Sequence, residues 1–336
     1  MEPLVLVTGI TGFVASHTVD ALLDRGYRVR GTYRKKDKLN QLFERQPSWK
    51  TRVELAYVAD GATPGSYDVA MKGVDYVCHI ASPVHRGGGP PRPRPQTLLE
   101  KAVYGTLNVM FAAVQNKSVK RVIFISSDAA VKGDKNYCGE GHVFTEKDWS
   151  PLTLQDAHNS TDEVLNYAVS KKFAEKAVHE LVEIAKPSFD IVCLCPPLIL
   201  GPVIHLTDLK SLNFSGWYMW NLINGENNIA PKTTIYNYVD VRDVAQAEVK
   251  ALTANVSHDR FIISAGSLSN DEITEILLRK TPEKKNLISK PSGDVVSRTF
   301  DLDASLSKKE LGITYRPKEE TFVDAAESLW EIANLW

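Results

Sequence analysis

Over the first 200 residues, short apolar runs alternate with longer segments in which apolar residues recur every three or four positions. An apolar run of roughly four to eight residues is typical of a buried strand, and the longer period is typical of an amphipathic helix. Strands are expected at residues 4–7, 27–33, 52–58, 74–80, 121–125 and 190–195, and helices at 14–25, 96–116 and 164–185. This alternation predicts an α/β fold with a doubly wound parallel sheet.

Beyond Pro202 the alternation becomes looser. A helix is expected to begin within residues 238–245, a strand at 260–264, and mostly helix from there to the end of the chain. One aromatic-rich segment on an expected helix could face a substrate cleft or belong to the core: Phe214, Trp217, Tyr218, Met219 and Trp220. The length suits one large α/β domain, or such a domain with a smaller lobe.

The first expected strand ends in two glycines, Gly9 and Gly12, just before the first helix. Glycine lets a backbone approach a ligand closely, and the free N–H groups at a helix start attract anions such as phosphates. Two glycines alone are a weak signal, because a strand-to-helix turn without a ligand has the same pattern. Other residues must therefore distinguish the two interpretations.

The second expected strand ends in a basic segment that contains Thr32, Arg34 and Lys38. At this point an NAD-binding unit usually has an Asp or Glu, which hydrogen-bonds to the ribose 2′-hydroxyl. A carboxylate would repel a 2′-phosphate, whereas a guanidinium can bind it in a forked geometry and an ammonium adds a second positive charge. The pattern favours NADP bound to a Rossmann-type unit; the alternative is a solvated basic loop.

The next strands are expected to end at the same carboxyl edge, where open parallel sheets bind ligands. Asp60 could accept a hydrogen bond from an adenine amino group, and the small residues Ala81 and Ser82 could let the chain pass close to a cofactor. His79 is interpreted as a packed strand residue rather than a catalyst. A Gly-, Pro- and Arg-rich segment at 86–95 is expected to be a surface loop, either a lid or a loop without a role.

Tyr167 and Lys171 are four residues apart in an expected helix, so both side chains lie on one face. Ser127 follows the fifth expected strand, and the helix should lie beside it. A free tyrosine has a pKa of about 10, and an adjacent ammonium is expected to lower the pKa of Tyr167. Ser127 would then hydrogen-bond a carbonyl oxygen, Tyr167 would act as general acid, and Lys171 would hold a nicotinamide ribose. The alternative is an unrelated surface tyrosine, surface lysine and strand-end serine.

The charge balance argues against several classes of partner. The 336 residues include 40 Lys and Arg against 41 Asp and Glu, so no overall field favours nucleic acid or an anionic membrane. No apolar run approaches the roughly 18 residues of a membrane-spanning helix, and no secretory signal is visible. The cysteines, at positions 78, 138, 193 and 195, lack metal-ligand spacing and are expected to be reduced and buried. We expect a cytoplasmic protein without a metal site.

Several motifs together resemble the extended short-chain dehydrogenase/reductases. The resemblance is carried by the loop Thr8-Gly9-x-x-Gly12-Phe13-Val14-Ala15, the pair Tyr167-x-x-x-Lys171 and the segment at 238–244. Within the family, the chain is most similar to the dihydroflavonol-4-reductase-like proteins, particularly the yeast and fungal NADPH-dependent carbonyl reductases, at residues 28–34, 79–83, 105–108 and 215–217. Ala102 stands where many extended members have Asn, and residues 128–133 contain no Asn, which plant dihydroflavonol reductases carry there.

The resemblance implies a Rossmann domain over residues 1–200, to which 237–264 return, and a smaller carboxyl-terminal α/β substrate lobe formed by 201–236 and 265–336. It implies NADPH-dependent reduction of a ketone or aldehyde by a monomer or homodimer, with Ser127, Tyr167 and Lys171 as catalytic residues. Tyr167 and Lys171 would also contact NADP(H), together with Gly9, Thr11, Gly12, Phe13, Val14, Arg34, Lys38, Asp60, Gly61, Ile80, Ala81, Ser82, Pro196, Leu198 and Ile199. A sugar-nucleotide epimerase or dehydratase and a non-catalytic dinucleotide-sensing regulator stay open as alternatives.

Overall fold

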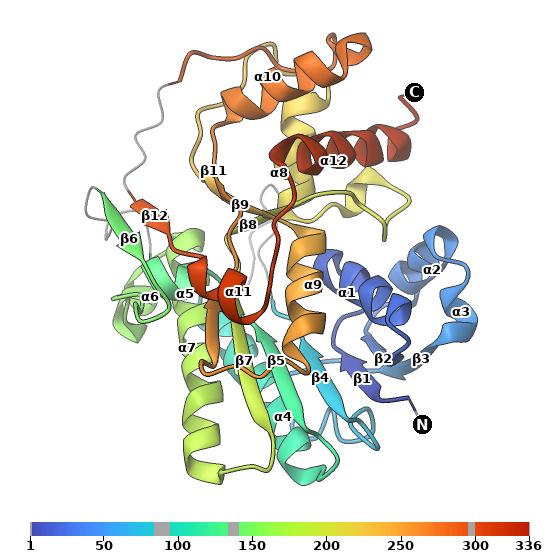
Figure 1. Cartoon of the computed structure of the whole chain (residues 1–336), viewed down its shortest axis with the longest axis vertical. Helices are drawn as coiled ribbons and strands as arrows, with labels where there is room; N and C mark the ends of the chain where they lie inside the picture. Colours follow the sequence, from blue (N-terminus) through green and yellow to red (C-terminus); the bar gives the residue numbers. More distant parts are fainter. Residues whose placement is uncertain (1, 84–94, 134–140, 295–299, 336) are drawn as a thin grey trace.

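The computed structural model describes residues 2–83, 95–133, 141–294 and 300–335 (Figure 1). In this part of the chain, seven strands form one parallel sheet in the order β3-β2-β1-β4-β5-β7-β10. They are β1 (Leu4–Val7), β2 (Arg28–Tyr33), β3 (Val53–Tyr57), β4 (Tyr76–His79), β5 (Arg121–Ile125), β7 (Asp190–Cys195) and β10 (Arg260–Ile262). The strand order reverses between β1 and β4, which is where open α/β sheets bind ligands. The predicted doubly wound α/β fold is confirmed.

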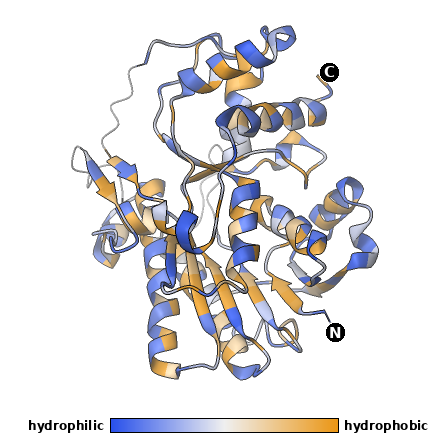
Figure 2. Cartoon of the chain, in the orientation of Figure 1, coloured by the Kyte–Doolittle hydropathy of each residue, from blue (hydrophilic) through white to orange (hydrophobic). Residues whose placement is uncertain are grey.

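Strand β1 is buried on both faces of the sheet. Val5 and Val7 belong to an apolar cluster with residues of α1 (Phe13–Asp24) and α9 (Val241–Ala251). Leu4 and Leu6 belong to a second cluster with residues of α4 (Pro95–Gln115) and α7 (Glu163–Ala185). Successive side chains of a strand point to opposite faces, so a strand between two helical layers needs apolar residues at every position. The apolar strands between the helices in Figure 2 follow this rule.

A second group of elements lies beyond the sheet, at the top of Figure 1. Helices α8 (Phe214–Ile223), α10 (Asn270–Lys280) and α12 (Lys318–Ile332) share their own apolar core. A three-stranded sheet of β8 (Leu198–Leu200), β9 (Asn237–Asp240) and β11 (Gly266–Ser267) adjoins it, and β6 (His142–Phe144) pairs with β12 (Phe300–Leu302).

The shorter elements, distributed along the described chain, are α2 (Lys36–Arg45), α3 (Trp49–Arg52), α5 (Ala129–Lys132), α6 (Leu154–Asn159), α11 (Ser305–Glu310) and the turns Leu209–Ser211 and Pro282–Lys284.

The helix expected to begin within 238–245 begins at Val241, where Asp240 caps it by accepting from the N–H of Arg242 at 2.8 Å. Residues 237–240 before it form β9, a strand that was not expected. Residues 128–163, for which no helix or strand was expected, contain α5, β6 and α6. Helix α6 begins with a capping box between Thr153 and Asp156, a signal that the sequence does carry.

The aromatic-rich segment forms α8, as expected, and divides between core and surface. Met219 is buried in the core of the second group of elements, whereas Trp217 is 44% exposed. Tyr218 is partly buried, and its hydroxyl donates to Oδ1 of Asn270 at 2.6 Å. This helix therefore contributes to packing within its own group, and only part of it is available to solvent or a ligand.

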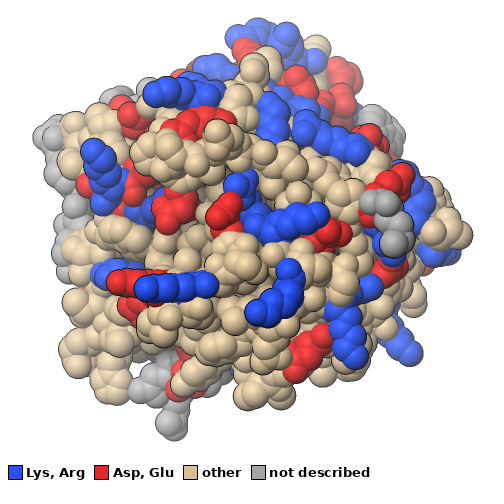
Figure 3. All heavy atoms as spheres, turned by 60° about the horizontal axis from the view of Figure 1, so that its bottom comes forward, with Lys and Arg blue, Asp and Glu red and all other residues tan. Residues whose placement is uncertain are grey.

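Charged side chains of both signs are interspersed over the face seen in Figure 3. Lys and Arg alternate there with Asp and Glu, in line with the balanced overall charge. Among the helices of the described residues, none has the length and apolar character needed to cross a bilayer.

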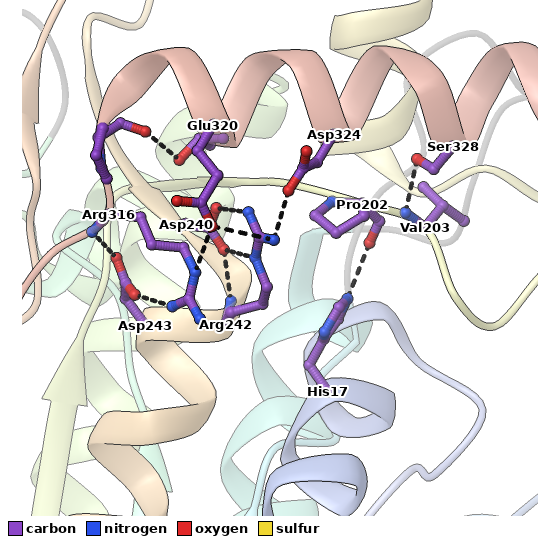
Figure 4. A network of polar contacts seen from close by, with 12 residues as sticks. His17, Pro202, Val203, Asp240, Arg242, Asp243, Arg316, Glu320, Asp324 and Ser328 are labelled. Atoms are coloured by element: carbon purple, nitrogen blue, oxygen red, sulfur yellow. Dashed lines mark hydrogen bonds and ion pairs between the residues drawn. The ribbon is translucent and has the colours of Figure 1, made fainter.

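A network of charges around the buried carboxylates of Asp240 and Asp243 joins α12 to the start of α9 (Figure 4). Arg242 donates to the carboxylate of Asp240 from Nε at 3.0 Å and from Nη2 at 2.7 Å, and to Oδ2 of Asp324 on α12 from Nη1 at 2.6 Å. Burial would raise the pKa of Asp240, but its hydrogen bonds and ion pair with Arg242 hold the pKa below its usual value. A second pair, Arg316 and Asp243, lies beside the first. These contacts fix α12 against the start of α9.

Replacing Arg242 by Met should reduce the free energy of unfolding by about 3 kcal/mol, because Asp240 would stay buried without its cationic partner. Arg279→Met is the matched control: its pair with Glu319 is 3.4 Å long and its side chain is 62% exposed, so the loss should be under about 1 kcal/mol. Urea unfolding of both variants measures the difference. Equal losses in the two variants would contradict this account of the network.

Candidate active site

The turn between β1 and α1 lies at the edge of the sheet where the parallel strands end, and its backbone can approach a ligand there closely. Gly9 has a φ of 73°, a conformation that favours glycine, and a Cβ added there would lie 3.1 Å from Cβ of Ala81. Gly12 is the N-cap of α1, and no side chain caps this helix. The N–H groups of the first turn are therefore available to an anion, which fits the phosphates of a dinucleotide.

Thr8, which the sequence places in the glycine motif without a role of its own, connects this turn to the segment after β4. Its Oγ1 accepts hydrogen bonds from the N–H groups of Ile80 and Ala81, both at 2.9 Å. The same hydroxyl lies 2.9 Å from Nδ1 of His79, and we assign it as the donor in that bond. Burial lowers the pKa of His79 to about 3, so the ring is neutral and serves packing, as expected. The segment Ile80–Ser82 is thereby held beside the glycine turn.

The basic residues expected to select NADP lie at the end of β2. Arg34 is exposed just after the strand, and Lys38 is half-buried in the first turn of α2. Within β2, a Cβ on Gly31 would lie 2.3 Å from Cδ1 of Ile10, so the glycine lets the turn after β1 pack against this strand. The guanidinium is thus accessible to a ligand that extends from the glycine turn along the end of β2.

Asp60 and Gly61 follow β3 at the same side of the sheet. Asp60 is exposed, and its Oδ1 accepts from the N–H of Ala62 at 3.1 Å. The carbonyl oxygen of Gly61 accepts from Nδ2 of Asn108 on α4 at 2.8 Å. The carboxylate therefore keeps acceptor capacity toward solvent, as contact with an adenine amino group requires.

Ser127 lies two residues beyond the end of β5. Its Oγ accepts from the N–H of Ala129 at 3.2 Å and donates to Oδ1 of Asp128 at 3.2 Å. Ser127 also lies close enough to Tyr167 to lower the pKa of that tyrosine. The neighbouring Ser126 points elsewhere, since its Oγ donates to Oε2 of Glu175 at 2.5 Å. Of the two serines, Ser127 is therefore the one beside the tyrosine.

Helix α7 carries Tyr167 and Lys171 past the end of β5. The Nζ of Lys171 is buried and donates to the carbonyl oxygen of Ile125, the last residue of β5, at 2.8 Å. Because this contact joins the helix to the strand that leads into Ser127, the three predicted catalytic side chains are brought to one place. The geometry can stabilise charge on a substrate oxygen and supply it with a proton.

The pKa of Tyr167 differs from the sequence-based expectation. Burial raises the pKa of Tyr167 to about 12, and the hydrogen bond with Ser127 only partly opposes this change. The expected lowering by Lys171 is wrong for this geometry, because the Nζ of Lys171 is directed to Ile125. Burial lowers the pKa of Lys171 to about 8, while the negative charge of Glu175 acts in the opposite direction.

Sequence reasoning also missed Glu175, one turn after Lys171 on the same helix face. Its carboxylate is fully buried and accepts from Nε of Arg260 at 2.5 Å and from Ser126. The guanidinium of Arg260 stacks on the ring of Trp149 at 3.8 Å. The spacing of four residues from Lys171 was the available signal, but an acidic residue in a helix is most often solvated. Here it compensates two buried cations.

Other predicted contacts are spread along the ends of neighbouring elements. The side chain of Phe13 lies in the core of the second group of elements, near the ring of His205 at 5.9 Å. Only the backbone of Phe13 is thus placed for a phosphate. The carbonyl oxygen of Pro196 accepts from the N–H of Asp128 at 3.0 Å. The remaining expected contacts are half-buried at their positions: Thr11, Val14, Ser82, Leu198 and Ile199.

Three further expectations concern the cysteines, a metal site and Ala102. Cys78, Cys193 and Cys195 are free and buried, as predicted, while Cys138 lies outside the described residues, as does most of the segment 86–95. Glu175, His179 and Cys193 have ligand-type atoms within 4.8 Å of one another, but Glu175 is paired with Arg260, whose charge disfavours a metal ion there. Ala102 is 3% exposed in α4 and belongs to the apolar core.

Comparison with known proteins identifies relatives along the entire chain. An oxidoreductase of Schizosaccharomyces pombe is 53% identical over 335 residues, covering 100% of both chains. Ketoreductase azaE of Aspergillus niger is 35% identical over 340 residues, covering 98% of each. The crystal structure of yeast methylglyoxal/isovaleraldehyde reductase Gre2 complexed with NADPH is similar with a TM-score of 0.87 and 30% identity, covering 98% of this chain and 99% of that one.

A model of the family described as "NAD dependent epimerase/dehydratase family" matches residues 5–264. The match includes the glycine turn, the Tyr167 and Lys171 pair and β10. Together with the relatives that align over nearly the whole chain, it confirms the resemblance seen in the motifs. The chain belongs to the NAD dependent epimerase/dehydratase family, and within it to the extended short-chain dehydrogenase/reductases.

Proposed function

We propose that this chain reduces a ketone or an aldehyde to an alcohol with NADPH. The observation that carries the proposal is the placement of Ser127, Tyr167 and buried Lys171 at the end of β5, at the sheet edge that also bears the uncapped start of α1. Its relatives support the substrate class and the cofactor, since they include a ketoreductase and a reductase whose structure contains NADPH.

The residues at this edge of the sheet fit a dinucleotide that carries a 2′-phosphate. The glycine turn offers backbone N–H groups to the pyrophosphate, and exposed Arg34 with Lys38 would hold the 2′-phosphate. Asp60 would accept from the adenine amino group. Further contacts would come from Thr11, Phe13, Val14, Gly61, Ile80, Ala81, Ser82, Pro196, Leu198 and Ile199. When bound, NADPH supplies the hydride of the reaction.

Side chains of the protein would stabilise the negative charge that develops on the substrate oxygen and supply the proton that this oxygen takes up. Ser127 would donate a hydrogen bond to the substrate oxygen and orient it. Tyr167, whose pKa is raised to about 12 by burial, holds its proton at neutral pH and would release it to the stronger base, an alkoxide. Lys171, whose ammonium is held by the carbonyl oxygen of Ile125, would hold the nicotinamide ribose. Tyr167 is therefore the proposed general acid.

The proposed site residues also suggest how the chain divides into a cofactor-binding part and a substrate-binding part. We infer that residues 1–200 with 237–264 hold the cofactor and that 201–236 with 265–336 shape the site for a small carbonyl substrate, in a monomer or a homodimer. Free, buried cysteines suit a reducing compartment such as the cytoplasm.

The description of the family favours a second candidate, a sugar-nucleotide epimerase or dehydratase. Such enzymes use the same tyrosine and lysine but return the hydride, so they cause no net oxidation of NADPH. The basic end of β2 supports the reductase, because an exchangeable reductant from the NADPH pool needs the 2′-phosphate contact. A non-catalytic sensor would not need the Tyr167 and Lys171 pair.

Replacing Tyr167 by Phe should lower kcat/KM for carbonyl reduction by a factor of about 100 or more, because the proton donor is lost. NADPH should still bind, with a dissociation constant close to that of the unmodified chain. Absorbance of NADPH with a panel of ketones and aldehydes measures the rates, and fluorescence titration measures binding. Tyr104→Phe, which alters a tyrosine that is 56% exposed on α4, is the control. Near-normal turnover by Tyr167→Phe would refute the mechanism.

Replacing Arg34 by Ala should weaken NADPH binding by about 30-fold, which corresponds to the loss of about 2 kcal/mol from a charge-assisted contact with the 2′-phosphate. Binding of NADH should change little, since NADH has no 2′-phosphate. The control is Arg25→Ala, an exposed arginine at the opposite end of α1. Titration of each variant with both cofactors gives the ratio of the dissociation constants for NADPH and NADH. An equal loss of affinity for both cofactors would show that the assignment of Arg34 is wrong.

A further inference from the structure

Glu248 lies in α9 and is fully buried where this helix packs against α1. The two helices lie side by side on one face of the main sheet (Figure 1). The layer between them and the sheet is an apolar cluster, to which β1 contributes Val5 and Val7. A carboxyl group in such a layer is unusual, and none of the roles proposed above uses it.

The hydrogen bonds around Glu248 indicate that its carboxyl carries a proton. The buried Thr18 hydroxyl, on α1, lies within hydrogen-bond distance of Oε2 of Glu248 and, at 3.0 Å, of the carbonyl oxygen of Val14. A hydroxyl has one proton and cannot donate fully to two acceptors. A proton on Glu248 satisfies both contacts, because Oε2 then donates to Thr18 and Thr18 donates to Val14.

The other oxygen of the carboxyl leads to the same assignment. Oε1 of Glu248 is buried and has no hydrogen-bond partner among the described residues. A carbonyl oxygen of a neutral acid tolerates this position at a much smaller cost than an oxygen of a carboxylate. Burial raises the pKa of Glu248 to about 8, and the hydrogen bond with Thr18 only partly opposes this change.

The groups around Glu248 provide no compensating positive charge. From the sheet, the thiol of Cys78 on β4 faces it, and burial together with the charge of Glu248 raises the pKa of that thiol, so it stays neutral. The other ionisable side chains of α1 and α9 are exposed or have partners elsewhere: Asp20 and Asp24 are exposed, His17 bonds to Pro202, Arg242 pairs with Asp240, Asp243 with Arg316, and Lys250 donates to the carbonyl oxygen of Gly312.

Ionisation of Glu248 would disturb the start of α1. The carboxylate would attract the Thr18 hydroxyl away from Val14, and its second oxygen would require water between the helices. Val14 lies in the first turn of α1, whose N–H groups are the proposed contacts of the pyrophosphate. A negative charge within the apolar layer would also repel the phosphates of a bound dinucleotide. Both effects oppose binding.

We propose that Glu248 is a pH-sensitive switch within the α1–α9 pair: the neutral acid belongs to the form that binds NADPH, and its ionisation in mildly alkaline solution weakens binding. The inference rests on the proposed binding of NADPH at the start of α1, and it adds regulation by pH to that site. Because coupling is reciprocal, bound NADPH in turn favours the protonated form of Glu248.

The pH dependence of stability tests the state of Glu248 without the cofactor. Its ordinary pKa of 4.5 applies to the unfolded chain, and its pKa in the fold is about 8. The stability that the neutral acid contributes is therefore full below about pH 4.5 and is lost as the pH rises to about 8, because the unfolded chain releases the proton first. The unfolding constant of the unmodified chain, divided by that of Glu248→Gln, should rise about 70-fold between about pH 5.5 and 7.5.

Urea unfolding at each pH measures both constants. The amide of Glu248→Gln can still donate to Thr18 but cannot ionise. Glu183→Gln alters an exposed carboxylate on α7 and is the matched control, whose ratio to the unmodified chain should stay constant within about twofold.

Affinity for NADPH tests the connection to the cofactor site. Through Glu248 alone, the dissociation constant should rise about tenfold between about pH 7 and 9, because the fraction of binding-competent chain falls by that factor. The pKa of Lys171 is also lowered to about 8, so Lys171 loses charge in the same range. Each fluorescence titration is therefore repeated with Glu248→Gln, which retains Lys171, and the tenfold effect is the difference between the two chains.

A third measurement uses the unmodified chain. In NMR spectra of a chain labelled with carbon-13 at the glutamate carboxyls, one signal should titrate near pH 8. The absence of any glutamate signal that titrates above about pH 7 would overturn the proposal, and this result is decisive even where Glu248→Gln does not fold.

An unfolding ratio that does not change with pH would overturn it as well. So would an equal pH dependence of NADPH affinity in the unmodified chain and in Glu248→Gln, because ionisation would then have no effect on the cofactor site. The failure of the underlying function looks different: the chain would bind no NADPH at any pH, while the unfolding ratio and the NMR signal would be as expected.

Discussion

The ammonium of Lys171 and the carbonyl oxygen of Ile125 form the hydrogen bond on which the candidate site depends. The donor lies in the middle of α7 and the acceptor is the last residue of β5, so this 2.8 Å bond fixes the helix against the carboxyl edge of the sheet. Tyr167 lies one turn earlier on the same helix, and Ser127 follows two residues after Ile125. Their proximity is therefore a consequence of one buried contact between two rigid elements.

A buried ammonium is stable only where polar or negative groups replace its water. The negative charge of Glu175 helps Lys171 in this way, and Glu175 in turn is paired with Arg260, which stacks on Trp149. At the junction with α12, Arg242 stabilises the buried carboxylate of Asp240 in the same way. Pairs of this kind add little net stability but fix geometry, because removing one partner leaves a buried charge. The candidate site is thus supported by charges that constrain one another.

The positions of the main strands along the chain, the glycine turn and the helix that bears Tyr167 and Lys171 could be predicted from local patterns, because each has a characteristic spacing. Thr8 and Glu175 could not, since their roles depend on partners 72 and 85 residues away that only the fold brings near. The pKa of Tyr167 was misjudged for the same reason: the sequence indicates a lysine nearby, but not that burial dominates or that the ammonium is directed to Ile125. The strand β9 was missed because its pairing with β8 and β11 is a tertiary contact.

The fate of the transferred hydrogen tests the account most directly. The two forms of NADPH that carry deuterium on one or the other face of C4 of the nicotinamide are each incubated with a prochiral ketone and the full chain, and the alcohol is analysed by mass spectrometry and chiral chromatography. The account predicts that one of the two forms places one deuterium on the carbinol carbon of a single enantiomer, with one NADPH oxidised for each alcohol formed. An alcohol without deuterium from both forms, or turnover of a sugar nucleotide without net oxidation of NADPH, would contradict it.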